Sequence, residues 1–343
     1  MKKLMLMLVV VGLVLVGSAQ AVPANLATSG TATASSYHIG GGGSGPSYLP
    51  SYTNDGIRAG VAPAIWHSST SPTPHYLEVD LGSDNYLDRL QIWHRTDGLD
   101  YQNFTNFQVQ VWDSGSNEVY NQTFDTGETA TYDTWGSIGV RGTLGQTVRI
   151  TELGADQYVQ MGEFEVFGQS LAPTASLLSS GATVTGTAPL AGTNAALANL
   201  TDGSIDGDWG RPDDGGNGAG MYHSNEKAAF VQVDLGSVQS IEYVNLFDRV
   251  DYNTTRTALV EILAGDGVTV LDSTALDLSG MADFDHVWTL GSAVNGQYVK
   301  VTNTTVDEWF SLSEIEVFGV VPEPATMALL GLGSLVLIRR KKA

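Results

Sequence analysis

A block of sequence that occurs twice limits what this chain can fold into. Residues 163–168 read Glu-Phe-Glu-Val-Phe-Gly, and residues 314–319 read Glu-Ile-Glu-Val-Phe-Gly. Apolar and acidic residues alternate in both, which is typical of a β-strand with one buried and one solvent-facing side. Glu165 and Glu316 are therefore expected to face water. Each copy stops on a glycine, so we interpret the block as the closing strand of a domain that occurs twice.

Other segments repeat in the same order. The pairs are 52–56 with 199–203, 66–68 with 222–224, 76–83 with 230–237, and 146–151 with 297–302. A shared order over so many segments indicates a duplication. The first domain is predicted over residues 22–168 and the second over residues 177–319. The short junction 169–176 contains Pro173 and is predicted to be a linker.

The composition favours an all-β protein. The chain has 343 residues and 40 glycines, and its strand-like segments are separated by Gly, Asn and Asp turns. Segments 77–82 and 107–111 alternate apolar and polar residues, as strands of a β-sandwich do. We therefore predict two tandem β-sandwiches.

The charge and the lack of cysteine exclude several classes of function. The formal net charge is −21, and six of the 16 basic residues lie at the two ends. The acidic middle repels phosphate backbones and anionic lipid, so nucleic-acid binding is not expected. Cys is 0, which excludes disulfides and thiolate catalysis. The fold must hold by packing, with or without the help of a metal.

The N-terminus predicts export. Residues 1–21 contain two lysines, the apolar run 4–16 and then Ala19-Gln20-Ala21. These are the three parts of a secretory signal peptide, with cleavage expected after Ala21. An uncleaved membrane anchor is the alternative.

The C-terminal segment 320–343 also has three parts. Pro322, Glu323 and Pro324 precede the apolar run 325–338 and four basic residues. The run is predicted to be a single transmembrane helix, although it is shorter than the roughly 20 residues of a typical span. The basic cluster would stay cytoplasmic.

This arrangement resembles the PEP-CTERM sorting signal of certain Gram-negative bacteria. The resemblance implies transient membrane anchoring, cleavage by an exosortase, and release toward the cell envelope or extracellular matrix. A plain membrane tail is the alternative.

The order of the repeated blocks resembles the discoidin, or coagulation-factor type C, superfamily. Its pattern is an Asp-Gly loop, an aromatic-plus-Ser element, a strand ending in Val-Asp-Leu-Gly and a closing Glu-Val-Phe-Gly-like strand. Both copies contain all four elements. The resemblance implies a galactose-binding-like jelly roll in each copy, with carbohydrate bound by loops at one end of the sandwich.

One segment of the second copy suggests a sugar site. Arg249, Asp251 and Arg256 follow an apolar strand, and strand-end loops often carry recognition residues. The forked N–H donors of the two arginines and the carboxylate acceptor between them can form hydrogen bonds with neighbouring sugar hydroxyls. The spacing resembles the signature of fucose-binding F-type lectins, which also needs an upstream histidine, here His223. The alternative is a structural Arg–Asp pair that ties down the loop.

The first copy keeps only part of this signature. Arg95 and Asp97 match and His67 lies nearby, but Gln102 replaces the second arginine. Fucose-type binding is therefore expected in the second domain.

Loop aromatics are further candidate platforms for sugar rings, or else loop anchors. Trp209 is the strongest of them, and the others are Tyr37, Tyr48, Tyr52, Tyr101, Tyr222 and Trp309.

Many members of this superfamily hold calcium between the Asp-Gly loop and the closing-strand glutamate. The matching residues are Asp55 and Glu163 in the first domain and Asp202 and Glu314 in the second. Backbone carbonyls would complete one Ca²⁺ site per domain. A hydroxyl that the family usually adds is missing, because Ala64 and Gly220 stand at its position. Otherwise the aspartates cap turns and the glutamates face water.

Little in the sequence indicates an enzyme. The 6 His are scattered, and neither a Gly-x-Ser-x-Gly nor a His-Glu-x-x-His motif occurs. We predict an exported, non-catalytic protein that binds carbohydrate or extracellular polysaccharide. The alternatives are a structural or adhesive matrix protein whose modules bind proteins or each other, and, third, a glycan-acting hydrolase.

Overall fold

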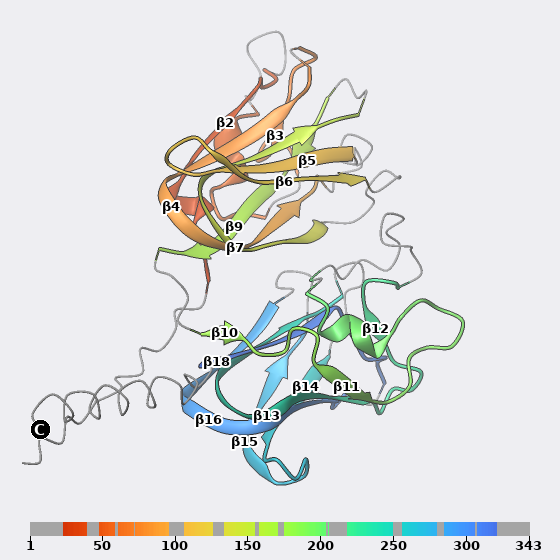
Figure 1. The fold of residues 1–343 in the computed structure, drawn as a ribbon. Coiled ribbons are helices and arrows are strands. Elements are labelled where there is room, and N and C mark those ends of the chain that lie inside the picture. Colours follow the sequence, from red (N-terminus) through yellow and green to blue (C-terminus); the bar gives the residue numbers. More distant parts are fainter. Residues whose placement is uncertain are drawn as a thin grey trace, which may run out of the picture.

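The computed structural model describes most of the chain between residues 23 and 320. The described residues are 23–39, 48–58, 61–71, 73–95, 106–125, 134–154, 158–170, 175–203, 205, 218–249, 256–279, 285–305 and 307–320. They form two all-β bodies without an α-helix in these ranges (Figure 1). We call residues 23–170 the first sandwich and residues 175–320 the second sandwich.

The first sandwich has one large sheet and one short ladder. Its strands are β1 (Ala24–Asn25), β2 (Thr31–Ala34), β3 (Trp66–His67), β4 (Tyr76–Trp93), β5 (Asn106–Trp112), β6 (Glu118–Asp125), β7 (Thr134–Glu152), β8 (Gln160–Met161) and β9 (Glu163–Gln169). The sheet order is β1-β9-β4-β7-β5-β6, with β2 on β4, and β3 pairs with β8. Two 3-10 turns, η1 (Ala27–Ser29) and η3 (Pro50–Thr53), lie between strands.

The second sandwich repeats this topology strand for strand. Its strands are β10 (Ser176–Leu177), β11 (Thr183–Gly186), β12 (Tyr222–His223), β13 (Phe230–Phe247), β14 (Thr257–Leu263), β15 (Val270–Asp277), β16 (Asp285–Asn303), β17 (Ser311–Leu312) and β18 (Glu314–Val320), with the 3-10 turn η5 (Leu197–Leu200). The sheet order is β10-β18-β13-β16-β14-β15, with β11 on β13, and β12 pairs with β17. The predicted fold, two tandem jelly-roll-like sandwiches, is confirmed.

The chain enters and leaves each sandwich at the same place. Ala24 of β1 pairs with Gly168 of β9, and Ser176 of β10 pairs with Gly319 of β18. The first and last strands of each repeat are therefore neighbours.

The long strands β4 and β13 serve two sets of neighbours. Residues 77–80 of β4 pair with β2, whereas residues 86–93 pair with β9. The register with β7 shifts between these halves, where Gly82 has a φ of 79°. Gly236 of β13 has a φ of 78° at the corresponding shift. Glycine adopts this left-handed conformation readily, which explains the repeated Asp-Leu-Gly segment.

Each sandwich has its own apolar core, made by the alternating residues of these strands. The first core includes Leu77, Val79, Leu90, Ile92, Val109, Val148, Phe164 and Val166. The second includes Val231, Val233, Val244, Leu246, Val260, Val299, Ile315 and Val317. Full burial of one such side chain stabilises a fold by about 1.5–3 kcal/mol.

The closing strands β9 and β18 are buried on both faces, so the expectation that Glu165 and Glu316 face water is wrong. Glu165 is 4% exposed and Glu316 is 1% exposed. Glu165 accepts a hydrogen bond from Trp93 Nε1 (2.7 Å) and pairs with Arg58 (3.0 Å). Glu316 pairs with Arg141 of the first sandwich. Sequence alternation identifies the side that meets the apolar core, but it does not show that charged partners cover the other side.

Both predicted export segments lie outside the described residues. These are the signal peptide 1–21 and the segment 320–343 beyond its first residue, which contains Pro322, Glu323 and Pro324. Within the described ranges, no helix has the length and hydropathy needed to cross a membrane.

We expect close packing to require glycine at the end of each closing strand. A Cβ atom on Gly319 would lie 2.0 Å from the backbone oxygen of Ser240. Gly319→Ala should therefore lower the free energy of unfolding by about 1–3 kcal/mol, measured by urea denaturation. Gly291→Ala is the matched control, because a Cβ there meets no atom within 4 Å. Equal losses in the two variants would contradict this explanation.

Candidate functional site

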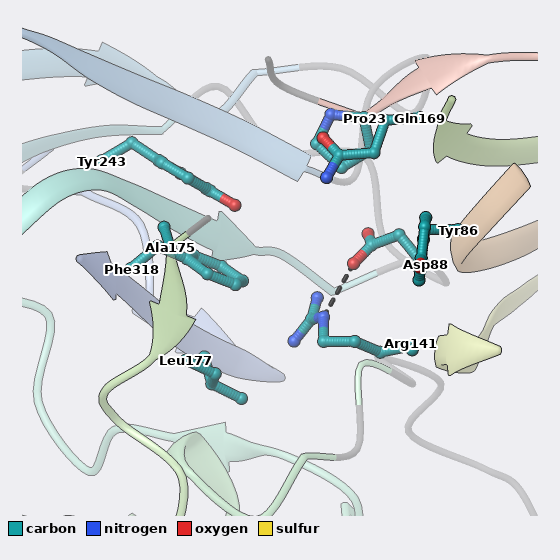
Figure 2. Close-up of a pocket in the computed structure, with 10 residues that line it drawn as sticks. Pro23, Tyr86, Asp88, Arg141, Gln169, Ala175, Leu177, Tyr243 and Phe318 are labelled. Carbon is teal, nitrogen blue, oxygen red and sulfur yellow. Dashed lines mark hydrogen bonds and ion pairs between the residues drawn. The ribbon is translucent and has the colours of Figure 1, made fainter. Parts of the chain in front are cut away.

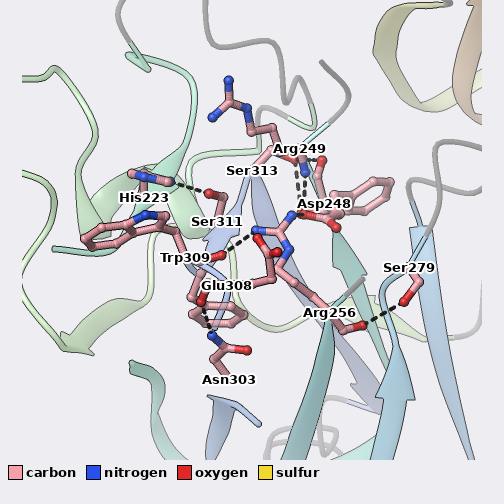
Figure 3. Close-up of polar contacts among 12 residues, drawn as sticks. His223, Asp248, Arg249, Arg256, Ser279, Asn303, Glu308, Trp309, Ser311 and Ser313 are labelled. Carbon is pink, nitrogen blue, oxygen red and sulfur yellow. Dashed lines mark hydrogen bonds and ion pairs between the residues drawn. The ribbon is translucent and has the colours of Figure 1, made fainter. Parts of the chain in front are cut away.

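In the second sandwich, the candidate site is built on the ladder of β12 and β17. Tyr222 pairs with Leu312, and both are buried in the core. The next pair, His223 and Ser311, joins through a hydrogen bond between His223 Nδ1 and the serine hydroxyl (Figure 3). The His223 ring lies 6.0 Å from the indole ring of Trp309. The ladder thus anchors an imidazole beside an exposed aromatic ring.

The first sandwich repeats this ladder with β3 and β8. His67 pairs with Gln160, as His223 does with Ser311. Burial lowers the pKa of the His67 imidazole, which favours the neutral form of its ring. A neutral imidazole can donate one hydrogen bond and accept another.

Three further rings surround His67. Its ring centroid lies 5.1 Å from His38, 5.5 Å from Tyr48 and 5.2 Å from Tyr158. Sequence reasoning missed His38 and Tyr158. The repeat could have revealed Tyr158, which precedes its ladder strand by two residues just as Trp309 does. We define the first ring cluster as His38, Tyr48, His67 and Tyr158, and the second ring pair as His223 and Trp309.

Arg256 lies behind the second ring pair, not on its surface. It is 1% exposed, its guanidinium pairs with the buried Asp248, and Nη1 donates a hydrogen bond to the backbone oxygen of Trp309 (3.0 Å). The structural Arg–Asp pair is thus formed with Asp248. Asp251, the aspartate between the two arginines, lies outside the described residues.

Arg249 occupies a different position from Arg256. Its backbone N–H donates a hydrogen bond to Asp248 Oδ1 (2.6 Å), and its side chain points away from the Arg256 guanidinium (Figure 3). Burial raises the pKa of Asp248, while the charge of Arg256 opposes that shift. Asp248 therefore holds both arginine segments together.

The first sandwich has a neutral group where the second has Asp248. The repeat aligns Asp248 with His94, whose burial lowers its pKa to about 3. It also aligns Arg256 with Gln102, which lies outside the described residues. The two positions therefore differ together: an ion pair in one copy corresponds to neutral residues in the other.

The remaining predicted sugar-binding residues divide into two groups. Arg95 is buried beside the first ladder, where it donates a hydrogen bond to Gln160 Oε1. Gln160 thereby connects Arg95 to the strand pair that carries His67. Asp97 and Trp209 fall outside the described ranges.

The predicted metal residues lie at the Asp-Gly loops. The backbone N–H of Gly56 donates to Glu163 Oε1 (2.9 Å), and that of Gly203 donates to Glu314 Oε1 (3.3 Å). Both glutamates are fully buried, so the alternative in which they face water is wrong. Asp55 does cap its turn, accepting a hydrogen bond from the backbone two residues on (2.8 Å).

One oxygen of each of these glutamates is unmatched. Among the described residues, Oε2 of Glu163 and Oε2 of Glu314 are buried without a hydrogen-bond partner. Burial raises the pKa of Glu163 to about 8 and that of Glu314 to about 9. The nearby carboxylates of Asp55 and Asp202 shift these values in the same direction. A buried carboxyl group of this kind is favourable only with a proton or a cation.

Side chains alone do not form a metal cluster in the part of the chain that the structure describes. No group of three or more His, Asp or Glu residues there could hold an ion. A cation at either Asp-Gly loop would therefore need backbone carbonyl oxygens as well. Calcium accepts such mixed oxygen ligands.

We expect the pair of Asp248 and Arg256 to be essential for stability. Arg256→Gln would leave a buried carboxylate without its counter-ion and should lower the free energy of unfolding by about 3–5 kcal/mol. Adding Asp248→Asn makes both positions neutral, as in the first sandwich, and should recover most of the loss in urea denaturation. A double variant as unstable as the single one would show that the two residues do not act as a pair.

Two segments of the sequence match known families. Residues 52–150 match the NedA-like, galactose-binding domain family of the F5/8 type C group, and residues 320–342 match the PEP-CTERM protein-sorting motif. The first segment lies within the first sandwich and does not include the second. A comparison with curated protein sequences finds no match.

Several solved structures are similar to the chain. A fucolectin from Morone saxatilis (striped bass) serum is 18% identical, with 88% of this chain and 99% of that chain covered and a TM-score of 0.36. The Streptococcus pneumoniae fucose binding module SpX-3 is 26% identical, with coverage of 42% and 96% and a TM-score of 0.36. The family 32 carbohydrate-binding module of C. perfringens NanJ, in complex with galactose, is 20% identical, with coverage of 43% and 98% and a TM-score of 0.33.

The galactose-binding family match lies within the all-β first sandwich. The described residues form two all-β sandwiches. Residues 52–150 thus match a galactose-binding domain family and residues 320–342 a sorting motif, and the two matches together support an exported carbohydrate-binding protein.

Proposed function

We propose that each sandwich binds sugar, without catalysis, at the ladder that carries its rings. The observation that carries this proposal is the same in both copies: a ladder histidine, His67 or His223, lies beside an aromatic side chain. Aromatic faces pack on the apolar faces of sugar rings, and a polar edge orients the ligand. The galactose-binding family match of residues 52–150 supports this ligand class for the first sandwich.

We propose a fucose-like sugar for the second sandwich. The support is the spacing of Arg249 and Asp251 downstream of His223, together with the indole of Trp309 beside that histidine. In this arrangement the indole packs against the apolar side of the sugar. Arg256 positions Trp309 through its backbone oxygen and does not contact the sugar.

We also propose that the protein acts outside the cytoplasm. The PEP-CTERM motif supports export through the inner membrane of a Gram-negative-type bacterium, with an exosortase as the processing partner. The mature protein would then meet polysaccharide in the envelope or the extracellular matrix.

Glycan-array binding tests the sugar sites. Trp309→Ala and Tyr158→Ala should each weaken binding by about 5- to 30-fold, because central aromatic contacts typically contribute about 1–2 kcal/mol. Phe230→Ala is the control, since this exposed ring lies on β13 and not on a ladder. Binding that both ring variants leave intact would contradict the site assignment. A protein that binds no glycan would favour the structural or adhesive alternative.

We propose one calcium ion at each Asp-Gly loop. Asp55 and Glu163 would hold it in the first sandwich, and Asp202 and Glu314 in the second. The support is the Oε2 atom of each glutamate, which is buried and has no hydrogen-bond partner among the described residues. A bound ion would supply the missing positive charge and tie the loop to the closing strand.

The raised pKa values of Glu163, about 8, and Glu314, about 9, make the calcium proposal testable through pH. Between about pH 5 and these values the folded carboxyls hold protons that the unfolded chain, with pKa of about 4.3, has released. The unfolded state then binds fewer protons, so stability without calcium should fall as pH rises from about 5 to 9. Calcium must displace the same protons, so its stabilising effect should grow over this range.

Thermal denaturation with and without calcium measures this effect. The variant with Glu163→Gln and Glu314→Gln should lose both the calcium response and the fall in stability with pH. Glu118→Gln changes an exposed glutamate and should retain both. A calcium shift that persists in the double variant would refute these sites.

A further inference from the structure

Charged side chains join the two sandwiches. Arg89 of β4 is 1% exposed and pairs with Asp88 (3.0 Å) and with Asp285 of the second sandwich. Arg141 of β7 pairs through Nε with Asp88 (2.7 Å) and through both terminal nitrogens with Glu316 of the second sandwich. We call these five residues the junction network.

Aromatic rings from both sandwiches enclose the two guanidinium groups. Arg89 lies 3.9 Å from the ring centroid of Phe167 and 5.7 Å from that of Phe247. Arg141 lies 4.9 Å from the ring of Phe318 in the second sandwich. Attraction between a cation and an aromatic face strengthens as water is removed. Glu316 is 1% exposed, whereas the Arg141 side chain is 30% exposed, so the junction is a partly desolvated contact between charges and rings.

Beside Arg141 the two sandwiches do not fill the space between them. A cavity of about 210 Å³ lies there, lined by Tyr86 and Gln169 from the first sandwich and by Leu177 and Tyr243 from the second (Figure 2). Apolar packing is incomplete on this side. Asp88 and Arg141 of the junction network line this cavity.

Glu165 and Glu316 occupy corresponding positions of the two closing strands, but only one of them pairs with an arginine of its own sandwich. Glu165 pairs with Arg58, which belongs to the same sandwich. Glu316 pairs with Arg141, which belongs to the other one. In the second copy the positions equivalent to the two arginines hold Ile205 and Ser292. The second sandwich thus has no arginine at either position. It can supply one neither to its own Glu316 nor to the closing strand of a further copy of the domain.

We propose that the junction network docks the two sandwiches as one rigid unit, in which Arg141 is the counter-ion that the closing strand of the second sandwich lacks. Removal of one partner of a buried ion pair is strongly unfavourable, because the other charge stays buried without compensation. Domains joined by a short linker normally move relative to each other. Here separation would leave Glu316 without its partner, so the docked arrangement is favoured.

Rigid docking has a consequence that rests on the proposed function. The first ring cluster and the second ring pair would lie at a fixed separation. On a repetitive polysaccharide, binding at one site would then hold the other at a defined distance from the polymer, which raises the effective concentration of the second site. The pair would select polymers whose repeat matches that distance.

X-ray scattering and calorimetry of the whole chain test the docking. The wild-type protein should give one compact scattering profile and one thermal transition. Arg141→Ala should increase the radius of gyration and lower the transition of the second sandwich by roughly 5–15 °C, splitting it from the first. Arg149→Ala is the matched control, because this arginine of the same strand pairs with Glu78 within the first sandwich (2.5 Å). A wild-type profile and a single transition in Arg141→Ala would overturn the proposal.

A second variant covers the case in which Arg141→Ala does not fold. Arg141→Gln combined with Glu316→Gln removes both charges of this ion pair, so no carboxylate stays buried without a partner at position 316, while Arg89 keeps its pairs with Asp88 and Asp285. The double variant should fold but still scatter as an extended pair, and a compact profile would count against the junction network.

Binding then tests the functional step. The double variant should keep its affinity for a monosaccharide, and its affinity for the polymer should fall at least tenfold. Failure to bind any sugar would refute the proposed function and leave the scattering result unaffected.

Discussion

Each buried carboxylate on the two closing strands requires a compensating partner, and several parts of the structure supply one. A carboxylate taken out of water needs a cation, sufficient hydrogen bonds or a proton. The two sandwiches meet this need in different ways. Glu165 pairs with an arginine of its own sandwich, and Glu316 pairs with an arginine of the other sandwich. Glu163 and Glu314 each accept one backbone N–H, and the second oxygen of each has no hydrogen-bond partner among the described residues. The loop conformation, the junction and the proposed calcium sites all follow from this requirement.

The sequence was sufficient to predict the fold because the fold depends on apolar alternation. Residues such as Val79 and Val233 recur at matching places in a repeated order, and both lie in the cores. Alternation carries no information about charged partners that come from distant segments. Arg141 is 175 residues from Glu316, so the burial of that glutamate could not be inferred from its own strand.

Candidate site residues were predicted less completely, for a similar physical reason. The motif spacing drew attention to Asp251, which lies outside the described residues, whereas among the described residues Arg256 pairs with Asp248, directly at the end of the strand. Motif spacing shows which groups are near one another in sequence. It does not show that Asp248 is buried and therefore requires the charge of Arg256 as compensation. His38 reaches the first ring cluster from a loop far from His67 in sequence, and no local pattern marks that approach.

The neighbouring first and last strands of each sandwich determine how the chain would respond to tension. Because Ala24 pairs with Gly168 and Ser176 pairs with Gly319, a pull on the ends of either sandwich acts on its two-residue strand pair before it reaches the core. The chain enters and leaves each sandwich at the same edge. Mechanical load can therefore pass along the chain while the core of the sandwich stays folded. For a protein held at one end and bound to a polymer elsewhere, the strand pairs β1–β9 and β10–β18 would be the first hydrogen bonds to open.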